Sequence, residues 1–290
     1  MRVAVELPGS FSFDAVVRSH GWYNLPPFSY DEERGMLAIV GARGATTFRS
    51  DGGRLEVAGP GPRKELERVA RRVFSLDLDL VAFDAMLDGD AALRRALARG
   101  GGRMLRAPTL FEDAVKMLLT TNCSWEATVG MVVRLIELAG EGGAFPTPAA
   151  IARLSSATLR RRVRCGYRAP ALARFARRVD SGRLDLAVWE RPETPAEDVR
   201  EAILAEYGFG PYAAEGLLRI LGRHEFFAID SWVRMKYRKL YPGPAKTVDR
   251  AIARRYARFG DYRGLALWLE LTRDWHEREV AVSVEGKTSA

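Results

Sequence analysis

The stretch from residue 196 to residue 234 reads AEDVREAILAEYGFGPYAAEGLLRILGRHEFFAIDSWVR. Two segments of helical spacing flank a tight connection made of Gly208, Phe209 and Gly210. Because glycine allows positive φ and close backbone approach, this pattern predicts two helices joined by a short hairpin. The second helix would offer free backbone N–H groups at its start, where an anion such as a phosphate can bind. Taken alone, most such turns are plain connectors between helices.

Asp230 follows the second helix after an apolar run, Phe226–Ile229. An aspartate here can cap a helix over Ser231–Leu240, and the same carboxylate can also take part in chemistry. Tyr212 lies just after Gly210, in the first turn of the second helix, and it precedes Asp230 at a separation of 230 − 212 = 18.

The chain before this stretch divides into a β-rich part and a helical part. Glycine-punctuated runs of alternating polarity predict an antiparallel sheet near the N-terminus. The expected strands are Arg2–Leu7, Met36–Val40, Thr46–Arg49 and Arg54–Val57. A helix over Pro62–Phe74 and two short helices within Leu80–Arg99 complete this part. We therefore expect an α+β protein with a β-rich domain over residues 1–104 and an all-α domain, in two helical lobes, over residues 105–290.

The helical part carries several start signals. Thr109 followed by Glu112 is a capping-box pattern, and Ser124 can cap the next helix. Thr194 followed by Glu197 predicts a second capping box, which opens the first helix of the hairpin.

Composition limits the classes of protein that remain. The 290 residues include 45 Lys+Arg and 37 Asp+Glu, a net charge of +8, with 47% hydrophobic residues, which is too apolar for wholesale disorder. No apolar run is long enough for a membrane span, and two cysteines are too few for a Cys₄ cluster or zinc site. The basic excess weakly favours a polyanionic partner, although a solvated surface explains it as well. We expect a cytoplasmic protein.

The hairpin and Asp230 together resemble the helix–hairpin–helix DNA glycosylases. That family has a Gly-apolar-Gly hairpin, a key position shortly after it, and a catalytic aspartate at about the separation that Tyr212 and Asp230 have here. Gly208, Phe209 and Gly210 match the hairpin, Tyr212 stands at the key position, and Asp230 matches the aspartate. The resemblance implies that the hairpin holds a DNA phosphate and that Asp230 is catalytic.

Two further stretches are similar to the 8-oxoguanine branch of that family. Within Thr120–Ser124, the resemblance implies that Asn122 fills the space left by a flipped base. Within Gly166–Ala169, it implies that Tyr167 wedges into the base stack and that Arg168 reads the base opposite the lesion. The 8-oxoguanine and alkylation-repair branches also carry an N-terminal antiparallel sheet domain, which suits the β-rich start of this chain.

Four departures from the 8-oxoguanine pattern bear on the chemistry. Tyr212 replaces the lysine with which bifunctional members form a Schiff base, and a phenol cannot form an imine. Gly216, Ala127 and Leu271 replace residues that bind the lesion or its partner base. An aromatic residue at position 212 resembles the pattern of alkylpurine glycosylases, in which aromatic rings stack against the base. We therefore expect Tyr212, Trp125 and Trp232 to line the base pocket.

The sequence thus predicts a monofunctional DNA glycosylase of base-excision repair that acts on a damaged or alkylated purine, with alkylated purines slightly favoured. We expect a monomer acting on double-stranded DNA that contains a damaged base, without a metal site or required cofactor. A monovalent cation bridging the hairpin to a DNA phosphate is compatible with the resemblance. Two alternatives stay open: a non-catalytic lesion-binding protein, and an 8-oxoguanine glycosylase whose lyase step uses another amine, such as Lys236. We expect a cytoplasmic location, nucleoid-associated in a prokaryote.

Overall fold

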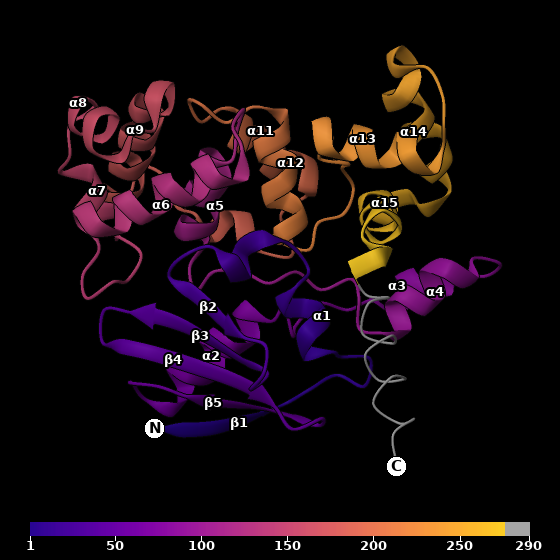
Figure 1. Cartoon of the computed structure of the whole chain (residues 1–290), viewed down its shortest axis with the longest axis horizontal. Helices are drawn as coiled ribbons and strands as arrows, with labels where there is room; N and C mark the ends of the chain where they lie inside the picture. Colours follow the sequence, from indigo (N-terminus) through magenta and orange to yellow (C-terminus); the bar gives the residue numbers. More distant parts are fainter. Residues whose placement is uncertain (276–290) are drawn as a thin grey trace.

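The N-terminal part of the protein is a five-stranded antiparallel sheet (Figure 1). The structure is a computed structural model, and it describes residues 1–275. The strand order is β1-β5-β4-β3-β2. The strands are β1 (Arg2–Glu6), β2 (Phe28–Asp31), β3 (Met36–Gly41), β4 (Gly44–Ser50) and β5 (Arg54–Ala58). The four strands expected from the sequence are confirmed, and β2 is an additional edge strand.

One face of this sheet is buried, as the alternating polarity of its strands requires. The buried side chains include Leu37, Phe48 and Leu55, which share a core with helix α2 (Arg63–Val73). The tight β4–β5 connection is stabilised by Asp51, whose Oδ1 accepts hydrogen bonds from the backbone N–H groups of Gly53 (3.1 Å) and Arg54 (2.7 Å). Such a side-chain turn fixes the register of the hairpin.

The regular structure in the rest of the described chain is helical (Figure 1). Those outside the site are α1 (Phe13–Val17), α3 (Val81–Ala85), α4 (Ala91–Ala98), α7 (Pro148–Ala152), α8 (Ser156–Thr158), α10 (Ala187–Glu190) and α14 (Val248–Tyr256). Those that position the site are α5 (Leu110–Leu119), α6 (Trp125–Ala139), α9 (Ala169–Asp180), α11 (Ala196–Leu204), α12 (Pro211–Ile220), α13 (Ser231–Leu240) and α15 (Arg263–Leu271). The expected α+β fold, a sheet followed by helices, is confirmed.

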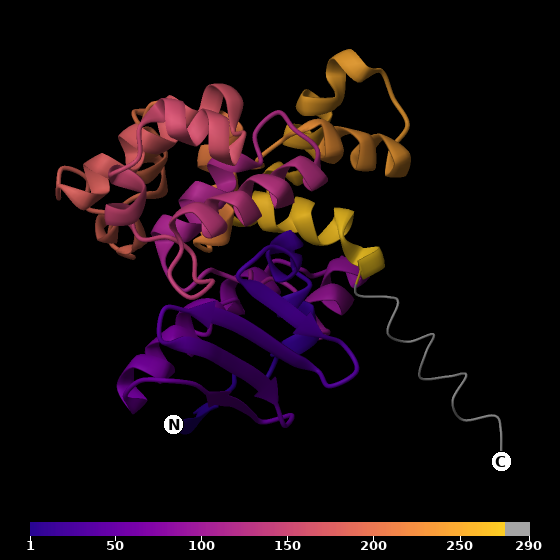
Figure 2. The same ribbon diagram turned by 60° about the vertical axis from the view of Figure 1, so that its left-hand side comes forward.

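The helices form two groups above the sheet. In Figure 1, α6 to α9 lie on one side and α13 to α15 on the other, with α11 and α12 between them, and Figure 2 shows both groups on the same side of the sheet. None of the helices within residues 1–275 combines the length and the apolar character needed to cross a bilayer.

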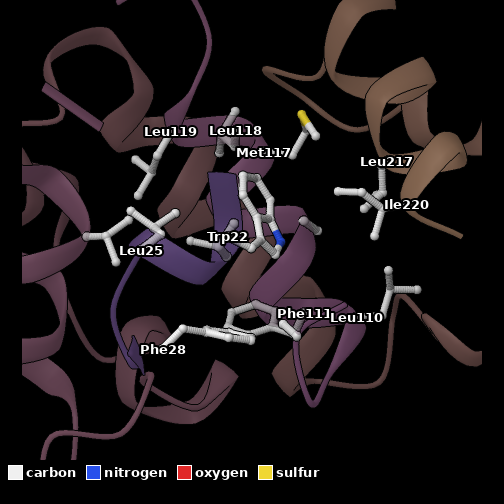
Figure 3. Close-up of a cluster of buried hydrophobic side chains, with 14 of the residues drawn as sticks. Trp22, Leu25, Phe28, Leu110, Phe111, Met117, Leu118, Leu119, Leu217 and Ile220 are labelled. Atoms are coloured by element: carbon white, nitrogen blue, oxygen red, sulfur yellow. The ribbon is translucent and has the colours of Figure 1, made fainter. Parts of the chain in front are cut away.

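The sheet does not have a core of its own. A single apolar cluster runs from the sheet and α2 into α5, α6, α9, α11 and α12. Figure 3 shows part of it, where Trp22 and Phe28 of the N-terminal part meet Phe111 of α5 and Ile220 of α12. Helices α3 and α4 lie on the N-terminal side of the expected boundary at residue 104, but they pack with α13 to α15 in a second cluster. The first cluster fixes the sheet against α5 and α12, two of the helices that line the site.

Most of the expected helix caps are formed. Thr109 and Ser124 accept hydrogen bonds at 3.3 Å and 3.2 Å from the backbone N–H groups three residues later. The capping box expected at Thr194 is wrong, because α11 begins after Pro195 with no side-chain cap. The Thr194 hydroxyl instead donates to the carbonyl oxygen of Val188 (3.1 Å), a bond within its own loop.

Candidate active site

A cavity of about 510 Å³ lies where the ends of α5 and α12 meet the starts of α6 and α13. Four of the residues singled out in the sequence line it together: Trp125, Tyr212, Asp230 and Trp232. They come from three helices and from the loop before α13, so the fold brings them together from distant parts of the chain. Their roles stay predictions, but their common location gives the cavity the character of a binding pocket for a planar ring.

Asp230 is held at the cavity by its own helix. Its Oδ1 accepts a hydrogen bond of 2.7 Å from the backbone N–H of Val233, so it is the N-cap of α13, as expected. Within residues 1–275, its second oxygen accepts no hydrogen bond from another group. The carboxylate is therefore oriented by one oxygen and keeps the other for a group inside the cavity.

The loop that carries Asp230 is fastened to the hairpin helices. Ala228 has a φ of 49°, a left-handed conformation that non-glycine residues rarely adopt. Its backbone N–H donates to Glu215 Oε2 of α12 (3.1 Å), and Glu215 is in turn paired with Arg200 of α11 (3.1 Å). No sequence pattern signals this bracing, because Glu215 reads as an ordinary polar position of an amphipathic helix.

Tyr212 occupies the first turn of α12 and reaches the same cavity. Burial raises the pKa of its phenol, and the negative charge of Asp230 raises it further. The phenol is therefore neutral near pH 7. None of the described residues that line the cavity is a lysine, and Lys236, the alternative amine, pairs with Asp274 at 3.0 Å.

Tryptophans make up much of the cavity wall. The rings of Trp232, Trp268 and Trp275 contact one another with centroid distances of 5.6 to 5.8 Å. Trp125 lies against Gly21, where a Cβ would come within 2.5 Å of its ring. Trp268 and Trp275, which the sequence did not single out, also line the cavity.

Two further lining residues, Arg219 and His20, were not singled out from the sequence. The Arg219 guanidinium carbon stands 3.9 Å from the centroid of the Trp268 ring. The His20 Nε2 atom lies 2.7 Å from the carbonyl oxygen of Leu105, which places the ring proton on Nε2. Burial lowers the pKa of His20 to about 3, and the positive charges of Arg219 and Lys116 contribute to this. His20 is therefore neutral, while burial also lowers the pKa of Arg219.

Asn122 and Tyr167 meet beside the cavity, at a place we call its rim, although neither residue is part of the lining. Asn122 has a φ of 47°, a conformation for which asparagine is one of the better suited residues. Its Nδ2 donates to the hydroxyl of Tyr167 (3.1 Å), although the two residues are 45 positions apart. The Tyr167 side chain is 59% exposed, and Cys123, next to Asn122, lines the cavity. Asn122, predicted to fill the space left by the flipped base, and Tyr167, predicted to wedge into the base stack, thus lie side by side.

Arg168 is engaged differently from what the resemblance implies. It is only 7% exposed, and its Nε donates to the hydroxyl of Thr121 (3.1 Å) while its guanidinium also donates to the Thr121 carbonyl oxygen. The group stacks on Tyr167 at 4.5 Å. In this structure Arg168 braces the turn that carries Asn122 and does not extend toward solvent.

The two hairpin glycines have different structural roles. Gly208 has a φ of +95°, and a Cβ there would lie 2.3 Å from the Cβ of Ala171 in α9, so only glycine fits. Gly210 is the N-cap of α12 and has no atom within 4 Å of an added Cβ. Phe209 is buried and packs on Phe175 (5.1 Å), which anchors the hairpin to α9. Across residues 1–275, no cluster of His, Cys, Asp or Glu could hold a metal ion.

A five-stranded sheet joined to two helical groups, with a hairpin before α12 and an aspartate in a tryptophan-lined cavity, is the architecture expected of the helix–hairpin–helix DNA glycosylases. The homologues of this chain are 8-oxoguanine and 3-methyladenine DNA glycosylases of that superfamily.

Three relatives illustrate the similarity, although no protein-family model matches the chain. A probable N-glycosylase/DNA lyase of Methanothermobacter thermautotrophicus is 26% identical over 92% of this chain and 95% of its own length. The 3-methyladenine DNA glycosylase of Archaeoglobus fulgidus has a TM-score of 0.70 at 26% identity, covering 93% of this chain and 98% of its own. The apo 8-oxoguanine glycosylase/lyase of Clostridium acetobutylicum has a TM-score of 0.74 at 20% identity over 93% of this chain and 95% of its own, and it has also been crystallised with double-stranded DNA containing cytosine opposite 8-oxoguanine.

Proposed function

We propose that this protein is a DNA glycosylase of base-excision repair, which takes a damaged purine out of double-stranded DNA and hydrolyses its N-glycosidic bond. The observation that carries the proposal is the meeting of Asp230, Tyr212 and the tryptophans around one cavity, with Tyr212 and Asp230 in the sequence register of the family. The relatives named above are glycosylases that cover more than nine-tenths of the chain, which supports the same activity.

Asp230 would supply the chemistry. Breaking a nucleoside's glycosidic bond builds positive charge on the sugar, as in glycoside hydrolysis. A carboxylate held next to that charge stabilises it, and it can also orient or deprotonate the water that attacks C1′. General-base assistance of this kind is typically worth ~10²–10⁴-fold in rate. The N-cap bond to Val233 keeps the carboxylate from turning away.

The rim residues would hold the DNA open. Flipping a base costs a few kcal/mol of lost stacking and pairing. Tyr167, exposed at the rim, would wedge into the stack, and Asn122 beside it would hydrogen-bond into the gap. Arg168 would reach the orphaned base only after leaving Thr121, so its first contribution is to hold the Asn122 turn.

The hairpin would position the backbone. The amides around Gly208 and Gly210 precede α12, whose N-terminus favours a phosphate, directly or through a monovalent cation. Such contacts carry no sequence information but make binding salt-dependent, with a slope of about −0.9 per phosphate in log K against log salt.

The reaction we propose is hydrolysis without strand cleavage. A lyase step needs an amine at the sugar, whereas Tyr212 stands at the family's lysine position and the described lining holds no lysine. This sets the protein apart from relatives named as lyases. We further propose that it acts as a monomer in the cytoplasm, on the nucleoid if its source is a prokaryote.

A panel of duplexes, each with one damaged base, tests the proposal. Incubation should release at least one damaged purine and leave an abasic site that breaks only after alkali treatment. Borohydride should trap no covalent protein–DNA adduct. Binding of the duplexes without release of any base would overturn the catalytic proposal, and a trapped adduct would overturn hydrolysis alone.

A further inference from the structure

Arg219 places a positive charge inside the proposed base pocket. It lies on α12 two helical turns after Tyr212, a spacing that brings both side chains to the same face of the helix. Both line the cavity together with Asp230 and Trp232. Arginine stays protonated at any physiological pH, so the charge is permanent.

This guanidinium has no polar partner within the described chain. Across residues 1–275, its side chain makes no hydrogen bond or ion pair, and its close contact is the stacking on Trp268 at 3.9 Å. Stacking uses the face of the guanidinium, whereas its five N–H donors lie in its plane. These donors are bonded to no described protein group and face the cavity, where a ligand that brings acceptors can pair with them.

The charges around Arg219 restrict which ligand that is. Arg219 and Asp230 are the two charged residues among the described lining, since His20 and Tyr212 are neutral. An aromatic pocket normally stabilises a cation through the faces of its rings. Here one face of Trp268 is already covered by Arg219, and a second positive charge in the same cavity would be repelled by it.

We propose that Arg219 determines specificity: it selects an uncharged purine that presents a carbonyl oxygen at its edge, and it excludes purines that carry a positive charge. This inference rests on the glycosylase function proposed above and narrows its substrate class. It removes cationic alkylated purines from the alkylated class that the sequence favoured. The planar fork of arginine matches an O6/N7 edge with two parallel hydrogen bonds, and it can also donate to the carbonyl oxygens of an oxidised purine.

The experiment compares matched bases in otherwise identical duplexes. Hypoxanthine and 8-oxoguanine are neutral and carry the carbonyl, whereas 7-methylguanine keeps the carbonyl but has a fixed positive charge and a blocked ring nitrogen. Single-turnover release should be at least about tenfold faster for the better neutral base than for 7-methylguanine, since one bidentate contact discriminates by about 1–3 kcal/mol. The variant Arg219→Met, which can still cover Trp268, should lose that preference, and Arg219→Lys should keep the exclusion of 7-methylguanine while releasing neutral bases more slowly.

The controls separate this role from two simpler ones. If Arg219 only compensates the charge of Asp230, Arg219→Met slows release of every base by the same factor, which would overturn the proposal. Arg238→Met, an exposed arginine of α13, should leave all rates unchanged. If Arg219→Met does not fold, the proposal is tested by the ratio of neutral-base release to 7-methylguanine release in the wild type and by the same ratio in Arg219→Gln. Faster release of 7-methylguanine by the wild type would overturn this inference alone, whereas release of no base from any duplex would overturn the glycosylase proposal and this inference with it.

Discussion

The two sides of the cavity are built in different ways. On the α12–α13 side, residues 207–230, the important groups are placed by backbone devices: a glycine at positive φ, a short helix and an N-cap. On the rim, Asn122, Tyr167 and Arg168 are placed by side-chain contacts between segments that are far apart in the chain. The first side depends on local geometry that a sequence pattern can specify, and the second depends on which long side chains find each other in the folded chain.

Asp230 on the first side and Arg168 on the rim illustrate this difference. Asp230 stands where the pattern puts it, because an aspartate at the end of an apolar run can satisfy the first N–H groups of a helix. Arg168 has the place in the chain that the resemblance requires, yet its guanidinium is taken up by Thr121. A motif therefore locates a backbone position more securely than it locates the end of a long side chain.

The largest effect is expected from Asp230→Asn. Asparagine is as good an N-cap as aspartate, so the helix and the unfolding temperature should stay the same. Asparagine carries no negative charge and cannot act as a general base, so release of the damaged purine should fall by at least ~10²-fold. Single-turnover kinetics with a lesion duplex measure this, with the duplex Kd as the control that the protein still binds. Activity within a factor of three of the wild type would remove Asp230 from the mechanism.

Next in size is the contrast between the two hairpin glycines. Gly208→Ala should lower the free energy of unfolding by roughly 2–4 kcal/mol, because the new Cβ meets Ala171 and the residue is held at positive φ. Gly210→Ala is the matched control, since its φ is −94° and its Cβ meets nothing. Its cost should stay within about 1 kcal/mol, the loss expected when alanine replaces glycine as an N-cap. Urea unfolding of both variants decides, and equal losses would refute the assignment of the steric requirement to Gly208.

The strands, the hairpin and the caps at Thr109, Ser124 and Asp230 were predictable from the sequence, because each follows from polarity or capping chemistry over a few residues. The prediction failed at Thr194, where the hydroxyl found a partner in its own loop. The packing of α3 and α4 with α13 to α15 had no local signal either, since α4 ends at Ala98 and α13 begins only at Ser231.

For the site as well, residues that belong to a local sequence pattern were predictable, and residues placed by tertiary packing were not. Asp230, Tyr212, Trp125 and Trp232 were identified from the sequence, whereas Trp268, Trp275 and Arg219 were not. In sequence Arg219 is one basic residue among the 45 Lys and Arg of the chain, and only the fold shows that its face of α12 turns into the cavity. The same holds for Glu215, whose bond to the Ala228 amide depends on how the loop returns to α12.

A third prediction concerns acid sensitivity of the loop before Asp230. His224 is 2% exposed, its ring nitrogens have no hydrogen-bond partner among the described residues, and burial lowers its pKa to about 3. The unfolded chain, with a histidine pKa near 6.5, therefore binds more protons than the folded one between about pH 3 and 6.5. The stability that neutral His224 contributes is present above pH 6.5 and is lost as the pH falls below it.

At pH 5 the loss from His224 should be about 2 kcal/mol relative to pH 7.5, from ~1.4 kcal/mol per pH unit. Because buried His20 has the same sign, the wild type should lose more than one histidine accounts for. His224→Phe should lose correspondingly less over the same range. Urea unfolding of both proteins at the two pH values measures the difference, and parallel losses would show that His224 is already protonated in the folded protein.

The smallest effects are expected at Tyr167 and its neighbour Arg168. They test whether Tyr167 affects only base release while Arg168 affects stability, as the contacts indicate. Tyr167→Ala removes an exposed side chain, so the free energy of unfolding should change by less than about 0.5 kcal/mol while release of the lesion base slows. Arg168→Met removes the donors that hold Thr121 and should cost about 1–2 kcal/mol of stability, with slower release following from a looser Asn122 turn. Stability and single-turnover rate are measured for both variants. If Arg168→Met left the stability unchanged and removed only the discrimination between bases opposite the lesion, its guanidinium would act on DNA as the resemblance implies, and the contrast between the two sides of the cavity would vanish.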